Sequence, residues 1–126
     1  METLNYLCDT SVLIEYLRGN TAIQKRLLRD KAGGLAIPTI AIMELLVGTF
    51  NQNEIRLIKK TFKDYRVIEI DETVSTLARN FIESYARSHG LLIPDALIAA
   101  TAITRKLPLF TLNRADFQFI PQLKLF

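Results

Sequence analysis

The chain has 126 residues, 49% of them hydrophobic, and 16 Lys and Arg against 13 Asp and Glu give it a formal net charge of +3. Its length and hydrophobic content exclude a disordered chain and predict a single domain spanning residues 1–126. A single cysteine and a single histidine exclude an intrachain disulfide framework and the usual zinc site.

Strand and helix signals alternate along the chain. Short apolar runs predict buried strands, whereas apolar residues recurring at helical spacing predict helices. In chain order, the predicted elements are a strand at 5–9, helices at 10–20 and 21–31, a strand at 33–38, helices at 39–49 and 53–65, a strand at 66–71, helices at 72–90 and 94–106, and strands at 107–113 and 123–126. This alternation predicts an α/β fold whose mostly parallel sheet is covered by helices on both faces.

Several residues mark the ends of the predicted helices. Thr10 or Ser11 is a candidate N-cap of the first helix, and Gly19 is its candidate stop. His89 and Gly90 fall at the end of the long helix, where a histidine favours the negative end of the helix dipole and a glycine closes the last turn. This structural role for His89 gives no support to a histidine-based ribonuclease mechanism.

Three apolar segments each contain one isolated acid. Asp9 ends the first predicted strand, Glu44 lies inside the 39–49 helix, and Asp95 lies in the first turn of the 94–106 helix. Asn113 and Asp116 follow the strand at 107–113. Because ligands of open parallel sheets bind beyond the carboxyl ends of the strands, we expect all these side chains to lie at one edge.

Carboxylates gathered at one edge repel one another and raise one another's pKa unless a cation neutralises them. Hard oxygen ligands select Mg²⁺ or Mn²⁺, which together with carboxylates activate water and stabilise the leaving oxygen of a phosphodiester. Each acid also has an ordinary interpretation: Asp9 as a helix cap, Asp95 as a favourable first-turn acid, and Asp116 as a loop residue. Glu44 is hardest to explain in this way because residues 40–47 offer it no polar face. We therefore favour one shared metal site.

Four stretches of the chain resemble the successive signature blocks of PIN-domain nucleases: "YLCDTSVLIEYLRG", "IAIMELLVG", "IPDALIAATAI" and "LFTLNRADF". They occur in the same order and at similar spacing, and the closest resemblance is to the VapC-type toxins of type II toxin–antitoxin pairs. The resemblance implies a parallel α/β/α sandwich and an endoribonuclease that depends on Mg²⁺ or Mn²⁺. It also implies a homodimer and inhibition by a cognate antitoxin.

The resemblance also implies the roles of individual residues. Asp9, Glu44 and Asp95 match the three principal acids of the family, whereas Ser11 and Thr111 match hydroxyl positions that orient carboxylates or water.

The fourth acidic position is ambiguous. Many members have an acid where this chain has Asn113, and Asp116 matches a "DF" pair that is also common in these toxins. We expect Asn113 to hold water or a metal and Asp116 to add charge, and the departure leaves the occupancy of a second metal open.

The basic residues favour a polyanion such as RNA only if the acids are sequestered around metal; otherwise they are ordinary solubilising charge. Arg18, Arg105 and Arg114 lie nearer the predicted acidic edge than the stripe of Arg56, Lys59, Lys60 and Lys63, so they are the preferred phosphate contacts. With neither a signal-peptide pattern nor a membrane-length apolar run, we expect a cytoplasmic protein without a membrane partner.

We expect hydrolysis without a covalent enzyme intermediate, leaving 5′-phosphate and 3′-hydroxyl ends, whereas attack by the RNA 2′-hydroxyl would leave a 2′,3′-cyclic phosphate. A metal-dependent phosphatase with an aspartyl nucleophile is an alternative, but it normally needs a second Asp where this chain has Ser11. A receiver domain would need an acidic pair after its first strand and a late lysine, and "LCDTS" and "FTLNR" supply neither. A catalytically silent binding module with the same fold is the remaining alternative.

Overall fold

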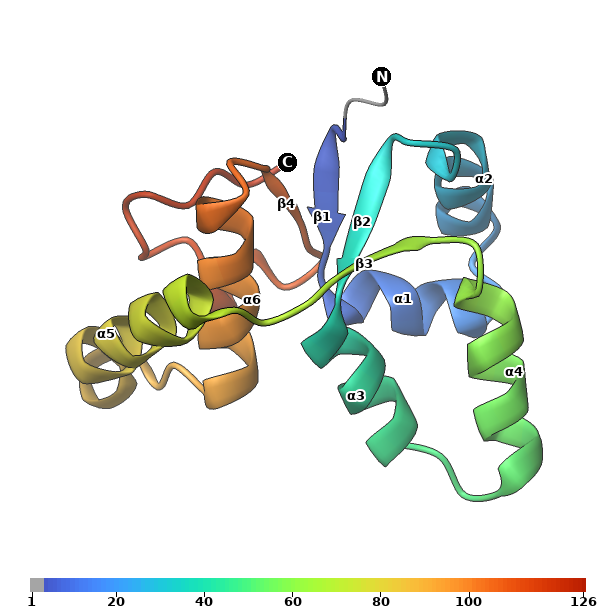
Figure 1. Cartoon of the computed structure of the whole chain (residues 1–126), viewed down its shortest axis with the longest axis horizontal. Coiled ribbons are helices and arrows are strands. Elements are labelled where there is room, and N and C mark those ends of the chain that lie inside the picture. Colours follow the sequence, from blue (N-terminus) through green and yellow to red (C-terminus); the bar gives the residue numbers. More distant parts are fainter. Residues whose placement is uncertain (1–3) are drawn as a thin grey trace.

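The structure is a computed structural model that describes residues 4–126. Its elements alternate as the sequence predicts (Figure 1). They are β1 (Tyr6–Cys8), α1 (Thr10–Leu17), α2 (Thr21–Asp30), β2 (Leu35–Pro38), α3 (Thr39–Val47), α4 (Gln52–Phe62), β3 (Arg66–Ile68), α5 (Glu72–His89), α6 (Ile93–Thr104), β4 (Leu109–Phe110) and a 3-10 turn, η1 (Arg114–Asp116).

The four strands form one parallel sheet in the order β3-β2-β1-β4. Strand β1 lies in the middle, with Leu7 paired to Ala36 of β2 on one side and to Leu109 of β4 on the other. This confirms the predicted α/β fold with a mostly parallel central sheet. Parallel strands of this kind are joined by helical crossovers, which leave both faces of the sheet covered.

Alternate residues of the central strands enter two separate cores, one on each face of the sheet. Leu7 and Ala36 belong to the core under α5 and α6. Tyr6, Cys8 and Leu35 point the other way, into the core formed with α1, α2, α3 and α4. Because side chains alternate across a strand, a single run of apolar residues fills both cores, which is the α/β/α layering expected from the sequence.

The carboxyl ends of the strands lie at one edge of the molecule (Figure 1). Helices α1 and α3 begin directly after β1 and β2, so their N-termini lie at this edge. Helix α6 runs in the opposite direction to the strands, and its N-terminus lies at the same end of the molecule (Figure 1). We refer to this region as the carboxyl edge.

Two details of the predicted elements are wrong. Residues 123–126 do not form a strand, because only a single bridge joins Leu125 to Leu109 of β4. The N-cap of α1 is Asp9 rather than Thr10 or Ser11, which lie inside the helix. The end of α5 is as predicted, since the helix ends at His89 and Gly90 adopts a left-handed backbone with φ of 69°.

None of the helices within residues 4–126 is long and apolar enough to cross a membrane.

Candidate active site

Asp9 is the buried acid of the carboxyl edge. It lies between β1 and α1 and is only 3% exposed. It occupies the N-cap position, but its carboxylate makes no capping hydrogen bond to the helix. Instead, Oδ2 accepts hydrogen bonds from the hydroxyls of Ser11, at 2.7 Å, and Thr111, at 2.8 Å. The cap interpretation therefore describes where Asp9 lies in the backbone but not what its side chain binds.

The two hydroxyls that hold Asp9 are themselves fixed by the backbone after β4. Ser11 Oγ accepts a hydrogen bond from the Leu112 N–H at 3.1 Å, and Thr111 Oγ1 accepts one from the Asn113 N–H at 3.0 Å. Each hydroxyl thus accepts from an amide and donates to the carboxylate. Within the described chain, the side-chain hydrogen bonds to Asp9 use Oδ2, and Oδ1 remains available to another ligand.

Glu44 is held by a residue that the sequence analysis assigned only as a candidate cap. The Glu44 side chain is partly buried on α3, and its Oε1 accepts a 2.7 Å hydrogen bond from the Thr10 hydroxyl. Thr10 is itself buried, at 8% exposed. The only hint of this contact in the sequence is a hydroxyl residue next to Asp9, and such a residue is equally typical of a helix start.

Asp95 lies in the first turn of α6 and is partly buried. Burial is the main cause that raises its pKa to about 7, and the negative charges of Asp9, Asp116 and Glu44 raise it further. The N-terminus of α6 acts in the opposite direction, because its dipole favours an anion. The four acids therefore interact electrostatically at the carboxyl edge.

Asp116 and Asn113 lie at the rim of this region. Both are exposed, Asn113 immediately before η1 and Asp116 at its end. The Asp116 N–H donates to the Asn113 carbonyl at 3.0 Å, so one tight turn carries both. The charge of Asp116 contributes to the raised pKa of Asp95, and the backbone N–H of Asn113 donates a hydrogen bond to the Thr111 hydroxyl.

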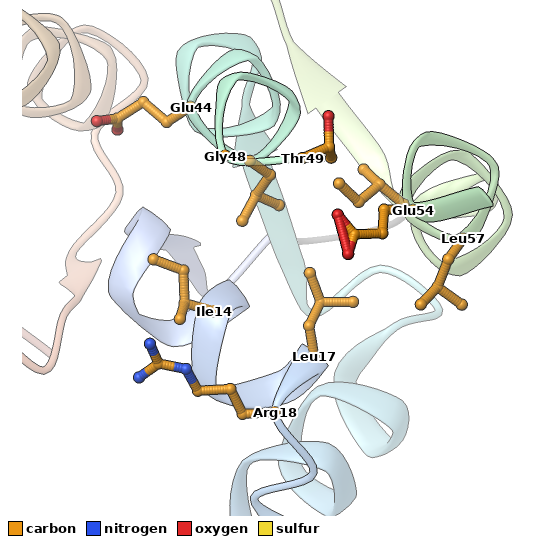
Figure 2. A pocket seen from close by; sticks show the side chains of 10 residues that line it. Ile14, Leu17, Arg18, Glu44, Gly48, Thr49, Glu54 and Leu57 are labelled. Atoms are coloured by element: carbon orange, nitrogen blue, oxygen red, sulfur yellow. The ribbon is translucent and has the colours of Figure 1, made fainter. Parts of the chain in front are cut away.

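A hollow of about 500 Å³ opens beside Glu44, between α1, α3 and α4 (Figure 2). Ile14 and Leu17 form part of its apolar lining, and Arg18 and Glu44 also line it. Figure 2 shows the Glu44 carboxylate turned away from Glu54, which lies toward the α4 side of the hollow. The hollow therefore has both apolar and charged side chains in its lining, and Glu44 is one of the charged ones.

The three arginines predicted as phosphate contacts lie in different places. Arg18 ends α1, lines the hollow and pairs with Glu15 at 3.3 Å. Arg114 is an exposed residue of η1, next to Asn113. Arg105 lies at the far end of α6 from Asp95, about 15 Å along the helix axis at 1.5 Å per residue. The placement expected for Arg105 near the acidic edge is therefore wrong.

The family model described as "PIN domain" matches residues 6–120, which include Asp9, Glu44, Asp95 and Asp116. The chain belongs to the PIN-domain family. Curated relatives of this PIN domain include Ribonuclease VapC10 of Mycobacterium tuberculosis, with 37% identity over 94% of this chain and 90% of the relative. Ribonuclease VapC1 of Methanocaldococcus jannaschii is 33% identical over 93% of this chain and 82% of the relative.

Solved structures share the fold of this PIN domain. A toxin–antitoxin complex from Klebsiella pneumoniae matches with a TM-score of 0.77 and 27% identity, covering 94% of this chain and 95% of that one. DNA-bound VapBC from Salmonella typhimurium matches with a TM-score of 0.84, covering 100% of this chain and 98% of that one. At 20% identity, the second match shows the fold alone.

The donor set of this PIN domain fits a hard divalent cation. It consists of carboxylate and amide oxygens, the ligands that Mg²⁺ and Mn²⁺ prefer. Among residues 4–126, the salt bridges leave Asp9, Glu44, Asp95 and Asp116 without a cationic partner. As placed, no three His, Cys, Asp or Glu side chains of these residues converge on a single ion position. The fit thus rests on donor chemistry and on the mutual repulsion of the acids, which a cation would relieve.

Proposed function

We propose that this PIN domain is an endoribonuclease that hydrolyses RNA phosphodiesters with the help of Mg²⁺ or Mn²⁺, and that it acts as the toxin of a toxin–antitoxin pair. Relatives at 37% and 33% identity are named ribonucleases, and each match covers more than nine-tenths of this chain. The complex from Klebsiella pneumoniae, at 27% identity, is named a toxin–antitoxin complex. These similarities support a nuclease acting on RNA.

One observation carries the metal dependence. A buried carboxylate, Asp9, is fixed by two hydroxyls, and its charge, with those of Asp116 and Glu44, adds to the burial that raises the pKa of Asp95 to about 7. A cation bound between the acids would neutralise their mutual repulsion and favour their ionised forms. If no cation binds there, the location of each of the four acids at one edge, without a cationic partner, needs a separate structural explanation.

The residues of the site have different roles, which we assign partly from how firmly each side chain is held. Asp9 and Asp95 would bind the cation, with Asp9 the fixed member because Ser11 and Thr111 hold one of its oxygens. Glu44 supports the cation or positions the attacking water, and Asn113 and Asp116 complete the polar rim. When bound, a divalent cation lowers the pKa of water and stabilises the oxygen that leaves phosphorus. A water oxygen forms the new bond to phosphorus as the O3′–P bond breaks, and a proton given up by the water ends on O3′, so the products are a 5′-phosphate and a 3′-hydroxyl.

The partners follow from the same proposal. RNA phosphates contact Arg18, which lines the hollow beside Glu44, and Arg114, which follows Asn113 in the chain. A cognate antitoxin inhibits the enzyme, and the chain forms a homodimer. Large apolar side chains on and after α3 are exposed and available for protein contacts, namely Met43, Val47 and Phe50.

Two other functions compete with this one. A silent binding module would keep the fold without binding metal, whereas a phosphatase with an aspartyl nucleophile would need a free carboxylate partner where Ser11 instead donates to Asp9. The phosphatase is disfavoured because the Ser11 hydroxyl is already used to fix Asp9. The silent module is separated from the enzyme by experiment.

The test is cleavage of total cellular RNA by the purified chain with Mg²⁺, with Mn²⁺ and with EDTA. Asp9→Asn and Asp95→Asn should abolish cleavage, whereas Glu83→Gln, an exposed acid of α5, should retain it. The fragments should carry 5′-phosphate and 3′-hydroxyl ends. Cleavage in EDTA, or cyclic phosphate ends, would contradict the mechanism. A folded chain that neither cleaves RNA nor binds metal would establish the silent module.

A further inference from the structure

Thr10 follows Asp9 in the chain and is hydrogen-bonded to a second acid of the site, Glu44 of α3. It is the first residue of α1, directly after Asp9, and its hydroxyl donates to Glu44 Oε1 at 2.7 Å. We propose that Thr10 is a positioning residue that fixes the Glu44 carboxylate at the carboxyl edge and thereby sets the affinity of the site for its cation. This inference rests on the proposed function.

Glu44 needs such a partner because its surroundings do not fix it. Its side chain is partly buried, lines a hollow of about 500 Å³ and loses rotamer freedom when it is held in one place. Arg18 lines the same hollow and offers an alternative, cationic partner. The Thr10 hydrogen bond holds the carboxylate against that competition, while Arg18 pairs with Glu15 at 3.3 Å.

Thr10 is well suited to this role because it is itself fixed. It is buried at 8% exposed, it is the first residue of a helix that directly follows a central strand, and a threonine side chain has few rotamers in a helix. A hydrogen bond to an ionised carboxylate is also stronger than one between neutral groups. Among residues 4–126, Glu44 Oε2 has no side-chain hydrogen-bond partner, and neither has Asp9 Oδ1.

The segment Asp9–Ser11 therefore contributes one of the acids and two of the hydroxyls that hold acids of the site. Asp9 supplies the fixed acid, Thr10 holds the acid of α3, and Ser11 holds Asp9. Because the three residues are consecutive and start one helix, the backbone of this turn sets the distance between the carboxylates of Asp9 and Glu44. Loss of the Thr10 hydroxyl should release only Glu44, since Ser11 and Thr111 continue to hold Asp9.

A purely structural role for Thr10 is the rival explanation, in which the bond only ties α1 to α3. The two roles differ in what the Glu44→Gln variant does. A positioning residue acts on the cation through the Glu44 charge, so Thr10→Val should change the cation affinity little once that charge is removed. A structural tie would persist in Glu44→Gln, because the glutamine carbonyl also accepts from Thr10.

The experiment is calorimetric titration of Mn²⁺ into the purified chain and its variants. Thr10→Val should weaken Mn²⁺ binding about 10-fold, in the range found when a residue that orients a metal ligand is removed, and Thr10→Ser should restore most of the affinity. In the Glu44→Gln background, Thr10→Val should cause no further loss. Thr101→Val is the matched control, because Thr101 is also buried but donates to the Leu97 carbonyl within α6. It should bind Mn²⁺ like the unmodified chain.

The outcomes separate this inference from the proposed function. Unchanged affinity in Thr10→Val, or an equal loss in the Glu44→Gln background, would overturn the positioning role while leaving the nuclease intact. A folded chain that neither binds Mn²⁺ nor cleaves RNA would overturn both. If Thr10→Val unfolds, as circular dichroism would show, the comparison of Thr10→Ser with Thr10→Ala decides the matter, since only serine keeps the donor.

Discussion

Thr111 lies 102 positions after Asp9 in the chain, yet its hydroxyl donates a 2.8 Å hydrogen bond to the Asp9 carboxylate. The register of the sheet brings them together, because Cys8 of β1 pairs with Phe110 of β4 and the next residue of each strand is Asp9 and Thr111. The Asp9 N–H also donates to the Phe110 carbonyl at 2.9 Å. The geometry around Asp9 is therefore a direct consequence of one strand pairing.

Thr111→Val should destabilise the chain. The substitution removes a donor to a buried carboxylate and also the acceptor of the Asn113 N–H, so we expect a loss of about 1–3 kcal/mol in the free energy of unfolding. Urea denaturation followed by circular dichroism measures it. Thr111→Ser should recover most of the loss, and Thr73→Val, at an exposed threonine of α5, should change stability little. A Thr111→Val variant as stable as the unmodified chain would show that the bond contributes nothing.

Asp95 should make the metal-free chain less stable as pH rises. Its folded-state pKa of about 7 lies above the ordinary value of 3.8, so the folded chain holds a proton that the unfolded chain releases. Stability should therefore fall as pH rises from about 4 to 7 and then level off. In EDTA, Asp95→Asn should remove this part of the pH dependence and be more stable than the unmodified chain at pH 8. Urea unfolding at pH 5, 6, 7 and 8 checks this, with Glu83→Gln as the control. Parallel curves for Asp95→Asn and the unmodified chain would contradict it.

The fold was predictable because its signals are local and repeated. The alternation of strands and helices, the apolar residues of both faces and the close of α5 at Gly90 follow from the order of residues alone. Residues 123–126 resemble a strand but form one bridge, because a short apolar run does not show how many residues of it pair with a neighbour. Strand pairing depends on register, which local sequence does not encode.

The gathering of the acids at one edge was also predictable, but the contacts that hold them were less so. Lone acids in apolar segments pointed to Asp9, Glu44 and Asp95 because burying a charge is costly. Thr10 was missed as a ligand of Glu44, since a hydroxyl at a helix start is usually a cap. The location of Arg105 was misjudged even though the direction of α6 decides it: with Asp95 in the first turn, a residue at the other end lies away from the carboxyl edge.

Mn²⁺ binding should weaken as pH falls below about 7. Asp95 has to lose its proton before it can bind the cation, and its pKa is raised to about 7 by burial and by neighbouring acids. One proton in competition with the metal corresponds to about a tenfold loss of affinity per pH unit below this value. Calorimetric titrations at pH 5.5, 6.5 and 7.5 measure the slope. A constant affinity over this range would mean that Asp95 does not bind the cation.

The arginines provide a final prediction, about RNA rather than metal. Arg18 lines the hollow beside Glu44, and Arg114 lies next to Asn113, whereas Arg105 is about 15 Å along α6 from Asp95. Arg18→Gln and Arg114→Gln should each weaken RNA binding and lower the slope of log affinity against log salt by about 0.7, the value for one phosphate contact on a single strand.

Arg105→Gln is the matched control, because it removes the same charge from the opposite edge of the sheet and should leave both quantities unchanged. Fluorescence anisotropy of a labelled, random-sequence single-stranded RNA in EDTA measures affinity without cleavage, at several salt concentrations. Equal losses from all three variants would mean that the RNA responds only to net charge. A loss confined to Arg105→Gln would place the RNA on the far edge and contradict the assignment of the carboxyl edge as the substrate site.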